Sequence, residues 1–190
     1  MLRPRPAALS SSALDELAAQ QLSALGRVGQ RLSEAGISYW LFGGWAVDFY
    51  AGAATRAHDD LDAAVWLDDV PTIATLLEAD GWHHAPEADE DGGTGYEQGA
   101  VRLELTYLVR GDDGRTYTPT SRGHAAWSEE ALGEDVRELN GVSARLIALA
   151  PLMRGKSSAR DDPDEAAKDR ADFNVLSAQA GRAEPPRTNA

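Results

Sequence analysis

The stretch LFGGWAVDFYAGAATRAHDDLDAAV, residues 41–65, carries the most information in this sequence. Its apolar start leads into two adjacent glycines, Gly43 and Gly44, and sixteen positions after Gly44 the carboxylate pair begins at Asp60 and continues at Asp62. Because side chains alternate across a strand, Asp60 and Asp62 are expected on one face, with their Cα atoms roughly 6–7 Å apart. The stretch therefore predicts a small-residue turn, a short helix, and a strand that presents two carboxylates together.

These two features suit the binding of a metal and a phosphate. Two carboxylates at this spacing can share a pair of hard cations such as Mg²⁺. A glycine pair at a helix start leaves backbone N–H groups free for a phosphate. We therefore expect Asp60 and Asp62 to bind metal and Gly43 and Gly44 to hold a phosphate, which makes a nucleotide-handling site the first hypothesis.

A third carboxylate is expected from the strand at residues 101–109, where apolar and polar side chains alternate. Glu104 lies on the polar face of this strand, where a lone acid needs a partner. Glu104 is the predicted third member of the site, as a metal ligand, as the base that takes a proton, or as both. The alternative is a salt bridge from Glu104 to Arg56 or Arg102.

Three cations are candidates for binding the triphosphate of a nucleotide. Arg56 can grip a phosphate with two parallel hydrogen bonds, although a surface ion pair explains it equally well. Lys156 can reach the β- and γ-phosphates as a point charge, and Lys168 can do so from the last helix. Ordinary helix cations are the alternative for both lysines.

Other polar and aromatic side chains around this stretch are assigned structural roles. We expect His58 to position the aspartate loop, Asp48 to support the glycine turn, and Asp59 to lie outside the metal shell because it faces opposite to its neighbours. Trp40 and Trp45 are expected in the core. Three aromatic side chains lie near loops that can line an acceptor cleft, although packing is their commoner role: Trp82, Tyr96 and Trp127.

Composition narrows the remaining choices. The chain has 190 residues, 43% of them apolar, and no cysteine, which excludes disulfides, thiolate zinc sites and a cysteine nucleophile. No apolar run reaches about 18 residues, so no membrane span is expected. The net charge of −13 disfavours binding to a nucleic-acid backbone and can attract cationic small molecules. A cytoplasmic protein, monomeric or homodimeric, is expected.

The pattern along the chain predicts an α/β (α+β) fold with a small mixed β-sheet. Helices are expected on one face of the sheet, and the open face is expected to carry the carboxylates. Asn140-Gly141 is the strongest hairpin signal. The expected organisation has four parts: a disordered leader at 1–12 that is not a signal peptide, a main domain at 13–146, C-terminal helices at 147–180 and a disordered tail at 181–190.

The stretch 41–65 resembles the signature of antibiotic nucleotidyltransferases in the DNA polymerase β superfamily, which include lincosamide and aminoglycoside 2″-adenylyltransferases. The glycine pair, the Trp-Ala-Val-Asp after it, Gly52, Thr55-Arg56, and His58 before Asp-Asp-Leu-Asp all match that pattern. VRLELT at 101–106 is similar to the family's third-carboxylate strand, which often has Asp where Glu104 stands. AKDRADF at 167–173 is similar to a Lys-Asp-x-x-Asp helix near the end of related enzymes.

The resemblance covers roughly residues 13–178 and implies a nucleotidyltransferase fold. It implies transfer of an NMP, most often AMP, from an NTP to a hydroxyl of a small antibiotic such as an aminoglycoside or a lincosamide, with two Mg²⁺ ions and release of pyrophosphate. The chain departs from the pattern at SSARDDPDE, residues 157–165, where the acceptor pocket is usually shaped. The alternatives are a toxin-like enzyme that modifies tRNA or protein, a non-catalytic nucleotide-binding module, and a Mg²⁺ phosphohydrolase.

Overall fold

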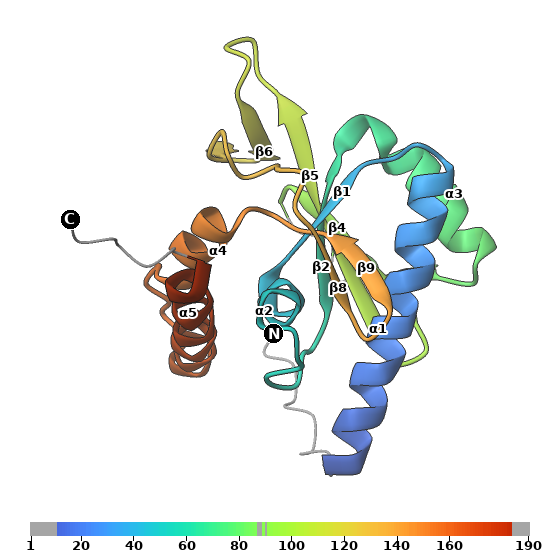
Figure 1. Ribbon diagram of the computed structural model, residues 1–190. Helices are drawn as coiled ribbons and strands as arrows, with labels where there is room; N and C mark the ends of the chain where they lie inside the picture. Colours follow the sequence, from blue (N-terminus) through green and yellow to red (C-terminus); the bar gives the residue numbers. More distant parts are fainter. Residues whose placement is uncertain (1–10, 87–88, 90, 184–190) are drawn as a thin grey trace.

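A mixed β-sheet forms the centre of the molecule (Figure 1). The computed structural model describes residues 11–86, 89 and 91–183. Within them the sheet has seven strands in the order β1-β2-β5-β4-β3, with β6 paired to β5 and β7 paired to β6. The strands are β1 (Tyr39–Phe42), β2 (Leu61–Trp66), β3 (His83–His84), β4 (Gly93–Gln98), β5 (Val101–Arg110), β6 (Thr116–Thr120) and β7 (Gly123–Ala126).

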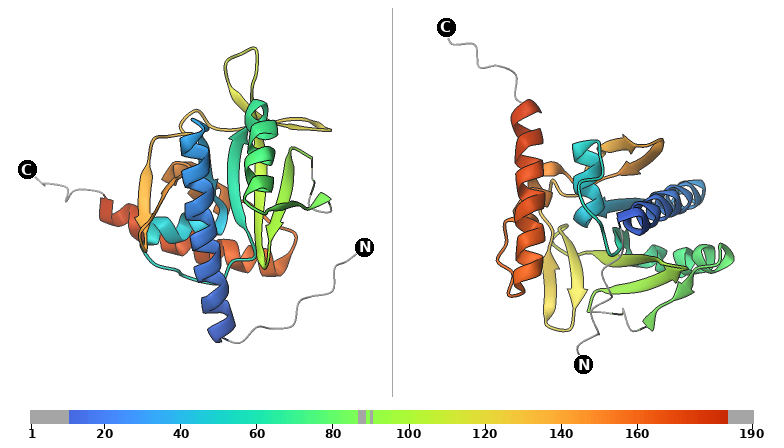
Figure 2. Two further views of the ribbon diagram at one scale, coloured as in Figure 1. Left: turned by 90° about the vertical axis from the view of Figure 1, so that its right-hand side faces the viewer. Right: turned by 90° about the horizontal axis from the view of Figure 1, so that it is seen from below.

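A two-stranded ribbon and five α-helices complete the described fold. The ribbon consists of β8 (Val136–Leu139) and β9 (Val142–Arg145). The helices are α1 (Ser11–Glu34), α2 (Gly43–Ala51), α3 (Val70–Ala79), α4 (Leu149–Lys156) and α5 (Pro163–Ala183), with a 3-10 turn at Leu67–Asp69. Helices α1 and α3 lie on one side of the sheet and α5 lies on the opposite side (Figures 1 and 2). The fold is therefore layered, with helices on both sides of the strands.

The register of β2 against β5 positions the candidate site. These two strands are parallel, and Asp62 lies directly opposite Glu104 in their register. A parallel pair needs a long crossover connection, and here α3, β3 and β4 lie between the two strands in sequence. Two carboxylates that are far apart in sequence thereby become neighbours.

The core is formed by apolar side chains that the local patterns point inward. Leu22, Leu25 and Leu32 recur at helical spacing along α1 and are buried. Trp40 and Trp45 are 5% and 2% exposed, in agreement with their predicted core positions. This packing fixes α1 against the sheet and keeps β2 and β5 in register.

Several local predictions are confirmed by the backbone. Asn140 and Gly141 have φ values of 49° and 80° between β8 and β9, as expected of a tight hairpin turn. The predicted strand at 101–109 is β5, and Leu103 and Leu105 on its apolar face are buried. The short alternating and turn signals were sufficient to place these elements.

Other expectations need correction. The polar composition of residues 87–95 predicts a loop, but Gly93–Gly95 belong to strand β4, and β7 was not expected either. Helix α1 begins at Ser11, inside the expected leader, and α5 continues to Ala183, beyond the expected end of the C-terminal helices at 180. The rest of the expected leader and tail, 1–10 and 184–190, lies outside the described residues. No helix in the described part of the chain is long and apolar enough to cross a membrane.

Candidate active site

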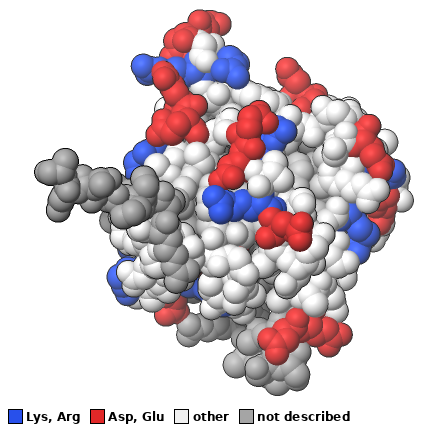
Figure 3. Space-filling model, in the orientation of Figure 1, with Lys and Arg blue, Asp and Glu red and all other residues white. Residues whose placement is uncertain are grey.

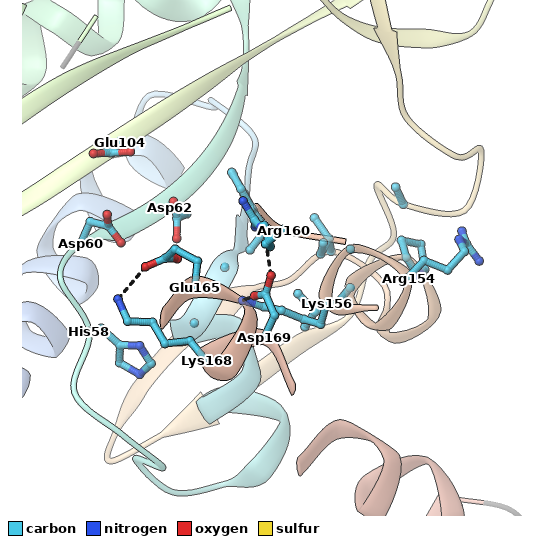
Figure 4. A pocket seen from close by; sticks show the side chains of 18 of the residues that line it. His58, Asp60, Asp62, Glu104, Arg154, Lys156, Arg160, Glu165, Lys168 and Asp169 are labelled. Atoms are coloured by element: carbon cyan, nitrogen blue, oxygen red, sulfur yellow. Dashed lines mark hydrogen bonds and ion pairs between the residues drawn. The ribbon is translucent and has the colours of Figure 1, made fainter. Parts of the chain in front are cut away.

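Three carboxylates converge at one end of the β2–β5 pair. Asp60 lies immediately before β2, Asp62 is on β2 and Glu104 is on β5. Each offers one oxygen atom, and these three atoms all lie within 4.8 Å of one another. This is the trio that the sequence pattern assigned to the metal site, and Figure 4 shows its members close together. Oxygen donors in such a group suit a hard divalent cation.

The trio is electrostatically strained without a cation. Burial, together with the charges of Asp60 and Glu104, raises the pKa of Asp62 to about 8, although Lys156 and Arg56 act in the opposite direction. Burial and the charge of Asp59 also raise the pKa of Asp60. Arg102 lies 3.7 Å from Glu104, from its Nη2 to Oε1, so the predicted alternative salt bridge is present beside the trio. A positive charge among these oxygens would relieve the repulsion between them.

The glycine pair allows the start of α2 to approach the trio. Gly43 has a φ of 68°, and a Cβ at this position would lie 1.8 Å from Oδ2 of Asp62. A Cβ on Gly44 would lie 2.3 Å from Nδ1 of His58. The N-cap, Phe42, makes no side-chain hydrogen bond to the helix start. The backbone at the start of α2 therefore lies against the Asp62 carboxylate, with no room for a side chain at residue 43.

A buried polar network holds the loop that leads into β2. Oδ2 of Asp48 lies 2.6 Å from Nε2 of His58, and Oδ1 accepts a 2.9 Å hydrogen bond from the backbone N–H of Thr55. Gln21 of α1 donates to the backbone carbonyl of His58 and accepts a bond from Nε1 of Trp45. His58 therefore has the structural position predicted for it, whereas Asp48 supports this loop rather than the glycine turn.

One buried carboxylate binds two of the predicted phosphate-binding cations. Asp172 of α5 is 1% exposed and accepts two 2.9 Å hydrogen bonds from Nε and Nη2 of Arg56. Nζ of Lys156 lies 2.8 Å from Oδ2 of the same Asp172 and 3.0 Å from Oδ1 of Asp169. Burial alone would raise the pKa of Asp172, but the hydrogen bonds from Arg56 and Lys156 lower it. Arg56 thus forms a partly buried ion pair, with its own side chain 23% exposed, rather than the surface pair considered from the sequence.

A second ion pair joins the aspartate loop to α5. Nζ of Lys168 lies 2.9 Å from both Oδ2 of Asp59 and Oε1 of Glu165. Arg160, in the segment 157–165 where the chain departs from the family pattern, binds Oδ2 of Asp169 at 2.8 Å. Figure 4 shows Arg160, Glu165, Lys168 and Asp169 in the same cavity as the trio. Asp59 binds Lys168 of α5 and is not part of the trio. This agrees with the prediction that Asp59 lies outside the metal shell.

The trio, the glycine pair and the cations that face them line one cavity of about 880 Å³. The carboxylate trio lies on one wall, and the cations of α4, α5 and the segment between them lie on another. Gly43, Gly44, Arg56 and Lys156 all line it. From the sequence, the trio was expected on an open sheet face. The structure corrects this, because the C-terminal helices face the trio across the cavity. Trp127 also lines the cavity, whereas Trp82 and Tyr96 are buried elsewhere.

Sequence reasoning noted the Lys-Asp-x-x-Asp pattern at 168–172 but gave Asp169 and Asp172 no role. Asp172 could not be paired from the sequence because its partner Arg56 lies 116 positions away. Acidic residues in a helix are most often solvated. The available signal was their spacing of three, which places both on one helix face.

The family model of aminoglycoside-2''-adenylyltransferases matches residues 24–176. The chain belongs to the aminoglycoside-2''-adenylyltransferase family. The matched range includes every residue of the trio and both buried acids of α5. This member of the family is therefore a nucleotidyltransferase enzyme. A comparison with curated protein sequences found no match.

Solved structures show the same fold for this family member. A solution structure of the antibiotic-resistance factor ANT(2'')-Ia is 18% identical, with a TM-score of 0.66 over 86% of each chain. The lincosamide antibiotic adenylyltransferase LnuA, solved with lincomycin bound, is 16% identical, with a TM-score of 0.62 over 90% of this chain and 98% of its own. ANT(2'')-Ia in complex with adenylyl-2''-tobramycin is 18% identical, with a TM-score of 0.61 over 87% of this chain and 99% of its own. At these identities the likeness shows the nucleotidyltransferase fold.

Proposed function

We propose that this protein transfers an adenylyl group from Mg·ATP to a hydroxyl of a small antibiotic-like molecule and releases pyrophosphate. The observation that carries the proposal is the trio of Asp60, Asp62 and Glu104, with ligand atoms within 4.8 Å of one another, in a cavity that is also lined by the glycine pair at the start of α2 and by cations. Family membership supports the reaction type. We place the reaction in the cytoplasm, where NTPs are supplied.

The residues of the trio fit a divalent metal site. All donors are carboxylate oxygens, which Mg²⁺ prefers, and the raised pKa of Asp62 reflects repulsion that a cation would remove. Gly43 leaves the room that Asp62 needs. Asp60, Asp62 and Glu104 would hold two Mg²⁺ ions, which supply charge neutralisation for the triphosphate and the leaving pyrophosphate.

The reaction needs one bond made, one bond broken and one proton removed. The acceptor hydroxyl oxygen attacks the α-phosphorus, the bond from that phosphorus to the bridging oxygen breaks, and the electron pair leaves with pyrophosphate. The hydroxyl proton goes to a carboxylate or to water. Glu104 is the proposed base, because its side chain lines the cavity and is 41% exposed.

The triphosphate is proposed to lie along the start of α2 and the cationic wall. N–H groups at Gly43 and Gly44 would bind phosphate oxygens, and Lys156 would add a positive charge beside them. The fork of Arg56 is occupied by Asp172, so Arg56 would act by its charge and by holding the loop rather than by a two-bonded grip on phosphate. The C-terminal helices, 147–180, are in this proposal the part that closes the nucleotide site.

The first experiment measures pyrophosphate release from Mg·ATP, Mg·GTP, Mg·CTP and Mg·UTP with aminoglycosides and lincosamides, and determines the mass of the acceptor. A mass gain of one AMP on one compound is expected.

Variants of the trio test the metal site. D60N and D62N should each lower turnover by about a hundredfold or more, because the proposed metal site loses a ligand. D68N removes an exposed carboxylate beyond the opposite end of β2 and should leave turnover unchanged. Retained activity in both D60N and D62N would contradict the metal assignment.

A second measurement separates the two roles of Glu104. If Glu104 is the base, E104Q should lower kcat far more than it weakens binding of Mg·ATP. An equal loss in both would leave Glu104 only a ligand.

A macromolecular acceptor is the rival function. The face of the molecule in Figure 3 has basic (blue) and acidic (red) side chains interspersed, so this face supplies no continuous basic surface for RNA. Binding of Mg·ATP with no small acceptor modified would favour that rival.

A further inference from the structure

A second cavity lies between α1 and the β8–β9 ribbon. It is a groove of about 840 Å³, and Figures 1 and 2 show α1 beside this ribbon. The described residues that line the groove include none of those that line the cavity of the trio. Strand β1 reaches both, because Tyr39 at its start lines the groove and Phe42 at its end lines the cavity. The groove is therefore a separate feature that the proposed reaction does not use.

The lining of this groove is cationic, although the protein is strongly acidic. The chain has 31 aspartates and glutamates against 18 lysines and arginines, yet no carboxylate is among the described residues that line the groove. Its charged members are Arg27 of α1 and Arg145 of β9. A groove lined by one sign of charge raises the local concentration of ligands of the opposite sign. The lining therefore favours an anion.

Arg145 has a guanidinium group that is held in place but weakly paired. Its Nη1 donates a 3.4 Å hydrogen bond to Oγ of Ser38, and its Cζ lies 5.8 Å from the ring centroid of Trp40. Its carboxylate partner in the described part of the chain is Glu134, at 3.3 Å from Nη2 to Oε2, and that side chain is 85% exposed. An ion pair so exposed contributes little to stability. Because a guanidinium has five N–H donors, Arg145 can bind an oxyanion without breaking a buried pair.

Arg27 adds a second positive charge from α1. Its Nη1 donates a 3.0 Å hydrogen bond to Oγ of Ser23, and its Nη2 donates a 2.9 Å hydrogen bond to Oε1 of Gln98. Both acceptors are neutral, and no carboxylate among the described residues pairs with Arg27. The charge of Arg27 is therefore not neutralised by an ion pair and adds to the positive field at the groove.

A buried hydroxyl faces the groove without a partner. Tyr39 is 8% exposed, and its Oη makes no hydrogen bond in the described part of the chain. Burial raises the pKa of Tyr39 to about 12, although Arg145 acts in the opposite direction, so the hydroxyl keeps its proton at neutral pH. A Cβ on Gly29 would lie 2.5 Å from this Oη, so the glycine leaves the space that the hydroxyl occupies. A buried donor without an acceptor costs free energy, and an oxyanion in the groove would supply the acceptor.

We propose that this groove is a second ligand site, which binds the phosphate group of a small molecule through the guanidinium of Arg145 and the hydroxyl of Tyr39. A phosphate has enough acceptor oxygens to take hydrogen bonds from both and from nearby hydroxyls. Such hydroxyls are present on the same lining: Ser33, Ser38 and Ser143. The volume lies within the range of small-molecule sites, roughly 300–1,000 Å³. The phosphate can be free or part of a nucleotide, and the site does not depend on the proposed transfer reaction.

A titration with inorganic phosphate tests the site directly. It is followed by the amide ¹H–¹⁵N resonances of the whole protein in EDTA, with sodium chloride at equal ionic strength as the reference. Saturable shifts are expected at Gly29 on α1 and Ser143 on β9, which line the groove. Shifts at Gly43 and Gly44 would report additional phosphate in the cavity of the trio and do not replace the expected ones. No saturable shift at either groove residue up to about 10 mM phosphate would overturn the inference.

Two variants of the ribbon form a matched pair. R145M should weaken phosphate binding at least about tenfold, because the site loses its guanidinium. R137M is the control: Arg137 also lies over an aromatic ring, at 4.6 Å from Cζ to the centroid of Tyr50, and also pairs with an acid at 3.3 Å, but it does not line the groove. R137M should change the affinity less than about twofold. Equal affinities in R145M and R137M would overturn the inference.

Y39F removes the buried hydroxyl alone. It should weaken phosphate binding at least about threefold, and it should not lower the Tm, because the hydroxyl has no protein hydrogen bond to lose. Y39F also keeps the test decisive if R145M loses its packing on Trp40 and fails to fold. An unchanged phosphate affinity in Y39F would overturn the role of this hydroxyl and with it the inference.

Three further probes identify the source of the phosphate. Pyrophosphate, AMP and acetate are titrated in the same way as inorganic phosphate. Tighter binding of AMP would support the site and assign the nucleoside to the rest of the groove, whereas tighter binding of phosphate or pyrophosphate would support a site for the free anion. Acetate that binds as tightly as phosphate would overturn the assignment to phosphate, because a carboxylate offers fewer acceptor oxygens.

Discussion

Residue 43 and Asp62 are in such close contact that only glycine fits: a Cβ at position 43 would lie 1.8 Å from Oδ2 of Asp62. One residue comes from the start of α2 and the other from β2. This contact places the backbone of the helix start beside a carboxylate of the proposed metal site. It gives a physical reason for the glycine pair to precede the two aspartates in the sequence.

G43A is expected to abolish most activity by displacing Asp62. G52A is its matched control, because Gly52 also has a positive φ, 74°, but a Cβ at position 52 would meet no heavy atom within 4 Å. Both changes carry the backbone strain of a left-handed residue, roughly 1–2 kcal/mol. Only G43A should also weaken Mg²⁺-dependent turnover, by more than about tenfold relative to G52A. Similar activities in the two variants would mean that the approach of residue 43 to Asp62 is not needed.

D62N should stabilise the metal-free protein although it removes activity. Asp62 is repelled by Asp60 and Glu104, and neutralising it removes that repulsion. Because the pKa of Asp62 is raised to about 8, its carboxylate is ionised only above that pH. Thermal unfolding in EDTA at a pH above about 8 should therefore show a higher Tm for D62N, by about 2–4 °C for each kcal/mol regained, and the difference should shrink as the pH falls below about 8. Added Mg²⁺ should raise the Tm of the unmodified protein and leave that of D62N nearly unchanged. A lower Tm for D62N in EDTA would show that Asp62 stabilises the fold without metal.

D48A should destabilise the fold by about 2–4 kcal/mol, measured by urea unfolding, because Asp48 is fully buried and bonded to His58 and Thr55. In a double-mutant cycle, D48A and H58A should be strongly non-additive. D113A is the control, since Asp113 is exposed although it accepts a 2.6 Å hydrogen bond from Tyr117. A loss in D48A no larger than in D113A would exclude a stabilising role for this network.

K156M should raise the KM for Mg·ATP by about tenfold or more, since a hydrogen bond to a charged group contributes roughly 1.5–3 kcal/mol. R31Q removes one positive charge from a surface pair of Arg31 with Asp80 and controls for net charge. If both variants changed the KM equally, the effect would be one of overall charge. An unchanged KM in K156M would remove Lys156 from the nucleotide site.

Local patterns predicted the elements whose signal lies within a few residues. Alternation identified β5, and Asn-Gly identified the β8–β9 hairpin. Strand β4 was missed because GTGYEQ has two glycines and little alternation, and it is stabilised by pairing with β5 rather than by its own propensity. Strand β7 likewise depends on its neighbour β6.

The candidate site also contains residues that local patterns predict and residues that they do not. The trio was predictable because Asp60 and Asp62 are two apart in sequence and Glu104 interrupts an apolar strand. The role of Asp172 was not, because it is fixed by Arg56 and Lys156 on distant segments. The pairing of these cations and carboxylates is determined by the packing of α5 against the loop before β2. No short sequence pattern predicts this packing.

The long separation between Arg56 and Asp172 also orders events during biosynthesis. A nascent chain that has emerged through β5 already contains all three carboxylates of the trio, yet α5 and its buried acid have not been made. Until Asp172 is translated, Arg56 and Lys156 lack the anchor that holds them at the cavity. Incomplete chains would therefore carry the proposed metal ligands without the organised cations of the proposed nucleotide site, which would be completed only with the last helix.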